Sequence, residues 1–523
     1  MLRYNNLPGV NIDVKDGQML LTQDNTANSV LIIGEVKSPS HVKVKDDAVL
    51  VQNENVLFEN FGQYFYQGQV NPIAAEWFIA RRAGIENIYL LGLNEATPKE
   101  NFMKLHYLLD EVIADYQFSH VVVTNMYADE DIQGLIASDF DTDDITEVSG
   151  VEAYYVVRGA ENVKAITLAE SESETLTAGY GEEEISATLK PGSYSAKELV
   201  RELTAEFEIA RRNIPGAPEV KVSIQDGKGV IQADSQVTLS GTEVLGALGI
   251  SEETEIEFTF EGTGNPALLL GRYAEQQTAE SEAMIVYIGT KPPKTTTKKD
   301  IRDMVDHLVE RDNEYSKHVQ VIAGPEVAVT LPNSTRTHWV SGVVQYATLV
   351  DSLAVQNATT NQPLPGASAL RYDLSLNQLN RLVGNKYVTF RRKNNRIVVV
   401  DGVTTAPDIL SEGDRKYHRS DFTRLSTLRS TNYMVGAVRE AVEPFIGRPN
   451  EFPVYNAMNT AIKGAINRAV ELGIIQDAIY SIELGSSMDA SNVNLTILPQ
   501  FELRQINVSI GLSTPAGFEA LSN

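Results

Sequence analysis

The sequence predicts a multidomain protein of the α/β and α+β classes, in which an α/β domain is split by a smaller inserted domain. Short apolar runs alternate with helix-like segments from residue 29 to residue 124, and the alternation resumes at residue 284. Between these stretches the chain changes to glutamate-rich turns with a helix and short strands. Because such alternation is typical of layered α/β units, we expect one α/β domain that the chain leaves and re-enters.

The elements of the α/β domain are predicted from their start and stop signals. Pro72 stands where a first helical turn tolerates the missing amide hydrogen, and Gly84 ends that helix. Trp77 and Trp339 are flanked by apolar residues and are expected in the core. The predicted strands are 30–33, 88–91, 120–124, 284–288 and 319–323, and the predicted helices are 72–84, 101–116, 299–314 and 339–355.

The inserted segment, residues 160–271, is predicted to be a small acidic domain of the α+β class. A helix over 195–212 precedes two alternating runs, 220–224 and 229–233, which the turn Asp226-Gly227 joins into a hairpin. Residues 161–261 hold about 20 acidic and about 8 basic side chains, so this segment carries much of the net charge. Since insertions are tolerated at exposed loops, we expect it to stand out from the surface.

Residues 366–523 are predicted to form a C-terminal α+β domain. It begins with a hairpin whose tip is basic, and Pro444 and Gly473 end its two helices. The predicted strands are 386–390, 397–400, 478–484, 492–498 and 501–512, and the predicted helices are 421–442 and 454–472. The tip residues are Arg391, Arg392, Lys393 and Arg396. A solvated turn and a docking element for an acidic surface both stay open for this basic tip.

Both ends of the chain carry extended, alternating runs with no obvious local partner. The apolar residues of these runs are Val10, Ile12 and Val14 near the start, and Leu503, Ile506, Val508 and Ile510 near the finish. A lone strand at a chain end exposes unpaired amide and carbonyl groups. We therefore expect each run to add to a sheet, either in its own chain or in another copy of the protein.

Length and composition narrow the class of protein. At 523 residues, the chain is long enough for about three to four folding units. The absence of cysteine excludes disulfides, thiolate nucleophiles and cysteine-bound metal centres. A net charge of −26 argues against nonspecific binding of nucleic acid. No apolar run approaches the roughly 18 residues that cross a bilayer, and the first residues do not resemble a signal peptide, so we expect the chain to fold in a cytoplasm.

Patterns that would indicate catalysis or metal binding are weak. Gly262-Thr263-Gly264 lacks the glycine spacing of a dinucleotide-binding turn, and the chain has no Gly-x-Ser-x-Gly elbow. His106 and His120 are expected at a helix surface and a strand edge rather than as ligands. The best metal candidate is a carboxylate cluster that lacks the glycine and glutamate of a calcium loop, which favours a solvated loop: Asp139, Asp141, Asp143 and Asp144. No cofactor is predicted, and a catalytic triad is left unsupported.

Several segments near the two ends follow one another in a recognisable order. They are Leu7-Pro8-Gly9-Val10, SVLIIGE at 29–35 and FENFG at 58–62, then NYM at 432–434, Glu443-Pro444, Gly447-Arg448-Pro449-Asn450 and ELGII at 471–475. In this order they resemble the contractile tail sheath proteins of bacteriophages. The resemblance covers the first 95 or so residues and the last 110 or so, and the acidic insertion departs from it. Tailocin and type VI secretion sheaths share the same core.

The resemblance implies a structural subunit, not an enzyme, without a cofactor. Such subunits stack as hexameric rings around an inner tail tube and contract to drive the tube through the host envelope for genome ejection. Baseplate and tail terminator proteins are further implied partners, and direct nucleic-acid contact and membrane insertion are not expected. The implied location is a virion tail that assembles in the host cytoplasm. The extended state would be a high-energy assembly that repacks during contraction.

On this interpretation the chain divides into four parts. They are an N-terminal arm (1–25), a split α/β core (26–159 plus 272–365), the inserted surface domain (160–271) and a C-terminal domain (366–523) with an exchange strand at 500–512. The terminal arms would add strands to sheets of neighbouring subunits, and the basic tip would dock on the tube or on a neighbour. A tailocin or type VI-like sheath and, less favoured, an envelope-degrading enzyme with an inserted binding module stay open as alternatives.

Overall fold

The computed structural model describes residues 29–39, 42, 44–115, 118–135, 151–169, 173–180, 183–214, 217–225, 227–233, 237–250, 259–280, 283–410, 417–448, 451–484 and 491–502. The predicted terminal strands, with Val10, Ile12, Val14, Leu503, Ile506, Val508 and Ile510, lie outside these residues, as do the arm 1–25 and the carboxylates Asp139, Asp141, Asp143 and Asp144. In the described parts of the chain, no helix is long and apolar enough to span a membrane.

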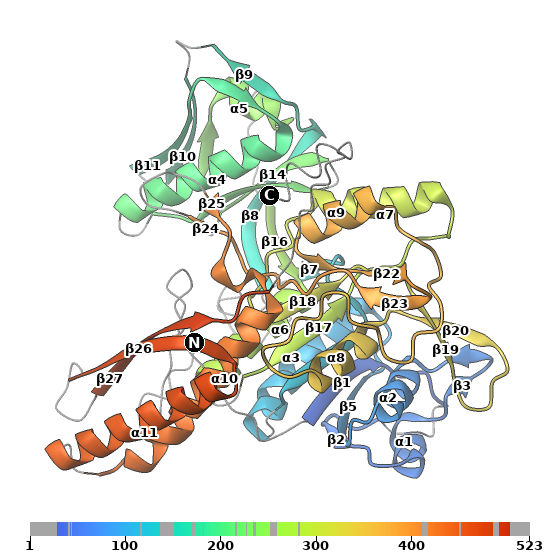
Figure 1. Cartoon of the computed structure of the whole chain (residues 1–523). Helices are drawn as coiled ribbons and strands as arrows, with labels where there is room; N and C mark the ends of the chain where they lie inside the picture. The colour runs from blue at the N-terminus through green and yellow to red at the C-terminus, as the bar shows by residue number, and fades with distance from the viewer. Residues whose placement is uncertain are drawn as a thin grey trace, which may run out of the picture.

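A seven-stranded sheet lies at the centre of the molecule, in the order β2-β5-β1-β6-β17-β18-β21 (Figure 1). All neighbouring strands are parallel except β2, which runs antiparallel to β5. Ile32 pairs with Leu90 on one side and with Val122 on the other. The strands are β1 (Ser29–Glu35), β2 (Val49–Leu50), β5 (Asn87–Leu93), β6 (His120–Tyr127), β17 (Ile285–Gly289), β18 (Val319–Ile322) and β21 (Tyr387–Val388).

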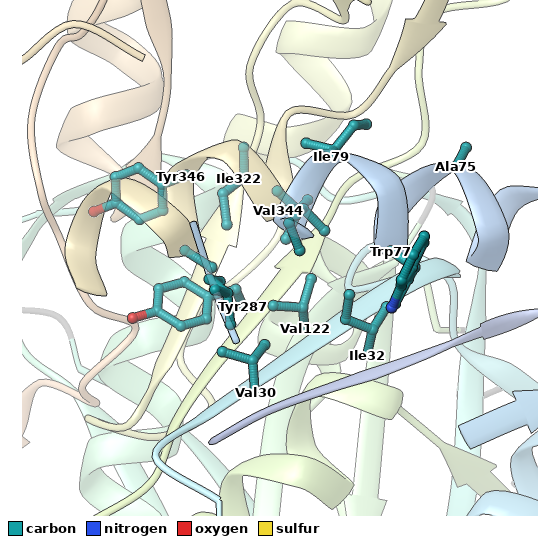
Figure 2. Close-up of a cluster of buried hydrophobic side chains, with 14 of the residues drawn as sticks. Val30, Ile32, Ala75, Trp77, Ile79, Val122, Tyr287, Ile322, Val344 and Tyr346 are labelled. Carbon is teal, nitrogen blue, oxygen red and sulfur yellow. The ribbon is translucent and has the colours of Figure 1, made fainter. Parts of the chain in front are cut away.

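Helices cover both faces of this sheet, so its strands are apolar on both sides. Val30 and Ile32 pack into one core with Trp77 and Tyr346 (Figure 2). The alternate residue Leu31 belongs to the core on the opposite face. The first core includes residues of α1 (Glu54–Phe61), α2 (Pro72–Arg82) and α8 (Val343–Ser352). The second includes residues of α3 (Pro98–Asp115), α6 (Pro266–Glu280), α7 (Lys298–Glu310) and α9 (Leu376–Gly384). Burial on both faces is typical of parallel sheets.

The predicted strands and most predicted helices of the α/β part are confirmed, with three corrections. The helix expected over 339–355 begins at Val343. Gly342 has a φ of +80°, which lies outside the right-handed helical region, so the helix cannot extend back through it. Trp339 lies instead in β20 (Thr337–Val340), which pairs with β19 (Val327–Thr330), and it is 39% exposed, so its expected core position is wrong. His120 is buried on β6 between β1 and β17 and is not at a sheet edge.

The chain between β6 and β17 forms smaller sheets around a core of their own. The predicted helix and hairpin are present as α4 (Ala196–Asn213), which Ser195 caps, and as β13 and β14. One sheet has the order β13-β14-β8-β16-β7, a second β11-β10-β15 and a third β12-β9. The strands are β7 (Ile132–Leu135), β8 (Val151–Asn162), β9 (Ile166–Leu168), β10 (Glu174–Tyr180), β11 (Glu183–Leu189), β12 (Gly192–Tyr194), β13 (Val220–Gln225), β14 (Lys228–Ala233), β15 (Thr238–Ser240) and β16 (Thr259–Gly264), with α5 (Thr242–Ala247) between the last two.

Past α9, the chain forms the basic hairpin and then a helical unit. The hairpin turn has Asn394 and Asn395 at φ of +49° and +58°, as a type I′ turn requires. Figure 1 shows α10, α11 and the hairpin β26–β27 extending together away from the central sheet. The elements are β22 (Phe390–Lys393), β23 (Arg396–Val399), β24 (Ile409–Leu410), β25 (Tyr417–His418), α10 (Leu425–Val442), α11 (Phe452–Glu471), β26 (Ile475–Leu484) and β27 (Ser491–Pro499), with short 3-10 helices at Asp421–Thr423 and Glu443–Phe445. A further small hairpin joins β3 (Phe65–Tyr66) to β4 (Gln69–Val70).

Candidate intersubunit surface

The hairpin β26–β27 is held on α11 by one of its two faces. Tyr480 lies on the side turned toward the helix, and its hydroxyl donates to the side-chain oxygen of Asn459 at 2.6 Å. The hydroxyl of Tyr455 donates to the carbonyl oxygen of Ile482 at 2.9 Å. Leu495 and Ile497 of β27 are buried in the same small core as residues of α10 and α11. These contacts hold one face of the hairpin against the helical unit.

The outer edges of the hairpin pair with no other strand among the described residues. β26 and β27 pair in antiparallel register from Ile475–Pro499 to Leu484–Ser491. Among the described residues, no third strand pairs with either of them. Each strand therefore has one edge that makes no ladder to another described strand. Such edges are templates for strand addition from another chain.

Exposed apolar side chains concentrate in the same unit. Among the other described residues, only three large apolar side chains are exposed, those of Tyr107, Trp339 and Leu376. Those exposed in the C-terminal unit are Ile446, Phe452, Val470, Leu472, Ile479, Leu498 and Phe501. Ile479, on the face of β26 turned away from α11, is 76% exposed, and so is Phe452 at the start of α11. Scattered apolar residues on a surface are ordinary, but a concentration at one end is typical of an interaction surface.

The basic tip is partly pre-organised by a single asparagine. A terminal nitrogen of Arg391 donates to the side-chain oxygen of Asn361 at 2.8 Å, and the ammonium of Lys393 donates to the same oxygen at 3.0 Å. Arg392 and Arg396 are exposed at the turn. The structure thus brings the four predicted tip residues together on β22–β23. Asn361 orients two of the cations, and Arg392 lies 3.9 Å from Asp373 in an exposed ion pair.

A cavity of about 230 Å³ lies at the carboxyl ends of β1, β5 and β6, where open α/β sheets commonly bind ligands. Three of the lining residues are glutamates, Glu35, Glu95 and Glu130, and each forms an ion pair with a lysine. The described lining contains no serine, cysteine or histidine. Nowhere in the described residues are three or more His, Cys, Asp or Glu side chains grouped to hold a metal ion. The three glutamates of the lining are therefore neutralised by lysines.

Sequence reasoning located the basic tip but missed the exposed apolar residues of the C-terminal unit. Ile479 is preceded and followed by Ala478 and Tyr480, so both faces of this strand are apolar. That double-sided pattern was the available signal, because a half-buried strand ordinarily alternates apolar and polar residues. The predicted arm residues lie outside the described residues, so their partners stay a prediction.

Comparison with known proteins gives a likeness in fold. No family model matches the chain, and no curated protein matches it. A chain of the anti-feeding prophage baseplate, from a six-fold symmetrised cryo-EM structure, covers 97% of this chain and 99% of its own at 12% identity and a TM-score of 0.50. The contracted helical sheath of the anti-feeding prophage covers the same shares at 12% identity and a TM-score of 0.49.

The contracted PVC sheath complex of an extracellular contractile injection system covers 98% of this chain and 99% of its own, at 10% identity and a TM-score of 0.47. Each of these three likenesses extends over nearly the whole of both chains. At these identities the likeness shows the fold.

Proposed function

We propose that this chain is the structural subunit of a contractile sheath. The observation that carries the proposal is the full-length likeness in fold to a chain of the anti-feeding prophage baseplate structure. It is supported by the sequence segments that resemble tail sheath proteins, and by a projecting hairpin whose outer edges pair with no other described strand. In this proposal, copies stack as hexameric rings around an inner tube and are joined to a baseplate and a tail terminator. Contraction would then drive the tube through the host envelope, for genome ejection in a phage or for delivery in a tailocin or type VI-like machine.

The open edges of β26 and β27 are the proposed sites of strand exchange. An added strand would hydrogen-bond to the free edge and place every second side chain on the face turned toward α11. The terminal runs suit this role, because Val10, Ile12 and Val14, and likewise Ile506, Val508 and Ile510, recur at every second position. Leu503 would precede the second run. Their side chains would extend the apolar layer that Leu495 and Ile497 begin.

The basic tip is a second proposed contact. Arg391 and Lys393 are oriented by Asn361, so less side-chain entropy is lost when they meet a carboxylate. Arg392 and Arg396 supply two more exposed cations. A chain of net charge −26 offers acidic surfaces in its own neighbours, and an acidic tube would serve equally. We therefore place this hairpin against the tube or against a neighbouring subunit.

Negative-stain electron microscopy of purified protein tests the proposal. Wild-type protein is expected to form striated hollow tubes, and deletion of residues 1–23 or of residues 503–523 is expected to give folded protein without tubes. The second deletion begins after Glu502 and keeps this residue, because its carboxylate accepts a hydrogen bond from Thr360. Dispersed wild-type monomers under every condition would contradict the sheath assignment, and normal tubes from both deletions would contradict strand exchange alone.

A matched pair of variants tests the register of the N-terminal arm. Replacing the apolar set Val10, Ile12 and Val14 with serine removes the side chains proposed to pack on a neighbour, so we expect tubes to be lost. Replacing the interleaved polar set Asn11, Asp13 and Lys15 with serine keeps that face and should leave tubes intact. Equal effects of the two triple variants would show that alternation is irrelevant to assembly.

A further inference from the structure

We propose that an ion-pair clasp locks the inserted domain in one orientation on the rest of the molecule. The clasp, as named here, consists of Arg201 on α4, Asp408 just before β24, Lys386 at the start of β21, and Glu314 after α7. It is a conformational device within one chain, so it does not depend on the proposed function. The inserted domain consists of α4 and the strands β8 to β15, which share one core.

The inserted domain has one continuous attachment, formed by β8 and β16. Figure 1 shows these two strands running between the domain that contains α4 and the central sheet. The base of this neck is pinned: Arg311 forms two hydrogen bonds to Asp131 at 2.9 and 2.8 Å, and Asn265 donates to Asp131 at 2.7 Å. Asn265 also accepts from the amide of Ala267 at 2.9 Å and so caps α6. A neck of paired strands can still bend and twist above such a base.

The clasp supplies a second attachment far from the neck in sequence. A terminal nitrogen of Arg201 donates to Asp408 Oδ2 at 2.7 Å. The other carboxylate oxygen of Asp408 lies 2.7 Å from the ammonium of Lys386. One turn earlier on the same face of α4, the ammonium of Lys197 donates to the carbonyl oxygen of Val309 at 3.5 Å. The helix therefore meets the body of the molecule along one edge.

The body side of the clasp is pre-formed. The side chain of Lys386 is 8% exposed, and its ammonium also contacts Glu314 and the carbonyl oxygen of Ala406, both at 2.7 Å. Lys386 has a φ of +65°, a strained conformation for a residue with a side chain, which these three contacts hold in place. Burial would raise the pKa of Asp408, but the charge of Lys386, and then that of Arg201, holds it below its ordinary value.

The inserted domain contributes a more exposed side chain to the clasp. The side chain of Arg201 is 48% exposed, whereas that of Asp408 is 12% exposed. When Arg201 is removed, Asp408 is still paired with Lys386. The substitution therefore leaves no buried charge without a partner. We expect loss of Arg201 to release the orientation of the domain without unfolding either side. High salt should weaken the exposed half of the clasp in the same way.

The chain contains no cysteine, so two introduced cysteines would carry spin labels at defined sites. We would label exposed Lys190→Cys in the inserted domain and exposed Asp303→Cys on α7. Pulsed electron–electron double resonance would measure the distance between the two labels. Diluting the labelled protein with an excess of unlabelled protein ensures that this distance lies within one chain. One narrow distance is expected without further substitution. Arg201→Ala should cause loss of that narrow distance in favour of a broad distribution.

Arg212→Ala is the matched control, because Arg212 lies on the same helix but pairs with Glu208 within it at 2.7 Å. The clasp is overturned if Arg201→Ala keeps the narrow distance, or if Arg212→Ala broadens it equally. Circular dichroism checks that each variant is folded. If Arg201→Ala fails to fold, Asp408→Asn on the same labelled background decides, with broadening again supporting the clasp and an unchanged narrow distance overturning it.

Discussion

Glu76 is a buried carboxylic acid that should make the stability of the α/β part fall as pH rises. It lies on α2 between Ala75 and Trp77, two residues of the core on one face of the central sheet (Figure 2). Its side chain is 5% exposed, and one carboxylate oxygen has no hydrogen-bond partner among the described residues. Burial raises the pKa of Glu76 from 4.5 to about 8. The folded protein therefore holds this proton at pH values where the unfolded chain has lost it.

The size of the effect follows from this difference in pKa. Because the folded pKa is raised above the unfolded one, stability is unaffected below about pH 4.5 and declines as pH rises toward 8. Each pH unit well inside this window costs about 1.4 kcal/mol and the slope levels off near each pKa, so the decline between pH 5 and pH 8 is about 3.5 kcal/mol. Glu76→Gln removes the ionisable group and keeps its shape, so this share of the pH dependence should vanish.

Urea unfolding followed by tryptophan fluorescence at pH 5 and pH 8 measures this difference. Trp77 is buried next to Glu76 and donates to the carbonyl oxygen of Val51 at 2.9 Å, so its emission reports on the same part of the structure. Glu59→Gln, at an exposed position on α1, controls for the general effect of removing a carboxylate. Any fixed cost of the new amide cancels in the comparison between the two pH values.

The reasoning fails if wild type and Glu76→Gln lose the same stability between pH 5 and pH 8. A parallel decline would mean that the carboxylate ionises in the folded state at little cost, through water or a rearrangement of α2. A decline in Glu59→Gln that is reduced as much as in Glu76→Gln would also contradict the assignment, since it would place the pH dependence at exposed groups as well.

Two further predictions concern packing and buried charge. Gly324→Ala should destabilise the protein by about 1–3 kcal/mol, because the new Cβ would lie 2.4 Å from Phe390; Gly464→Ala on α11, where nothing lies within 4 Å, should instead stabilise its unit by about 0.5–1 kcal/mol. Thermal melts of both variants check this, and destabilisation by Gly464→Ala would contradict it. Asp401→Ala should cost about 3–5 kcal/mol, because it strands Arg424, whose guanidinium lies 2.6 Å from a 3% exposed carboxylate. Asp306→Ala, which breaks the more exposed pair with Arg381, should cost about 1 kcal/mol or less, and equal losses in urea titrations of the two variants would refute the distinction.

Local signals in the sequence were sufficient for most elements of the central sheet. Four-residue apolar runs and Pro72 at a helix start depend only on near neighbours, and the strands and helix they predict are present. His120 shows where local signals end. It was expected at an edge, but β17 comes about 160 residues later in the chain and covers β6, and nothing near residue 120 reports that distant pairing.

The candidate surface was predictable only in part. The basic tip follows from four cations around Asn394-Asn395, a turn that the local sequence specifies. The exposure of Ile479 and Phe452 depends on how α11 and the hairpin pack, so an apolar residue there could equally have been a core residue. Trp339 shows the converse, since flanking apolar residues predicted burial for a side chain that the β19–β20 pairing leaves exposed.

The pairing of β6 with β17 also has a consequence for synthesis on the ribosome. Val121 of β6 pairs with Val286 of β17, so the growing chain must add about 160 residues after the first strand before its partner exists. At about 5–20 residues per second, the edge of β6 waits roughly 10–30 s. During that time β5, β1 and β6 form a half-sheet with an apolar edge, which is prone to aggregate. A chaperone that binds nascent chains would therefore act most usefully while the inserted domain is being translated.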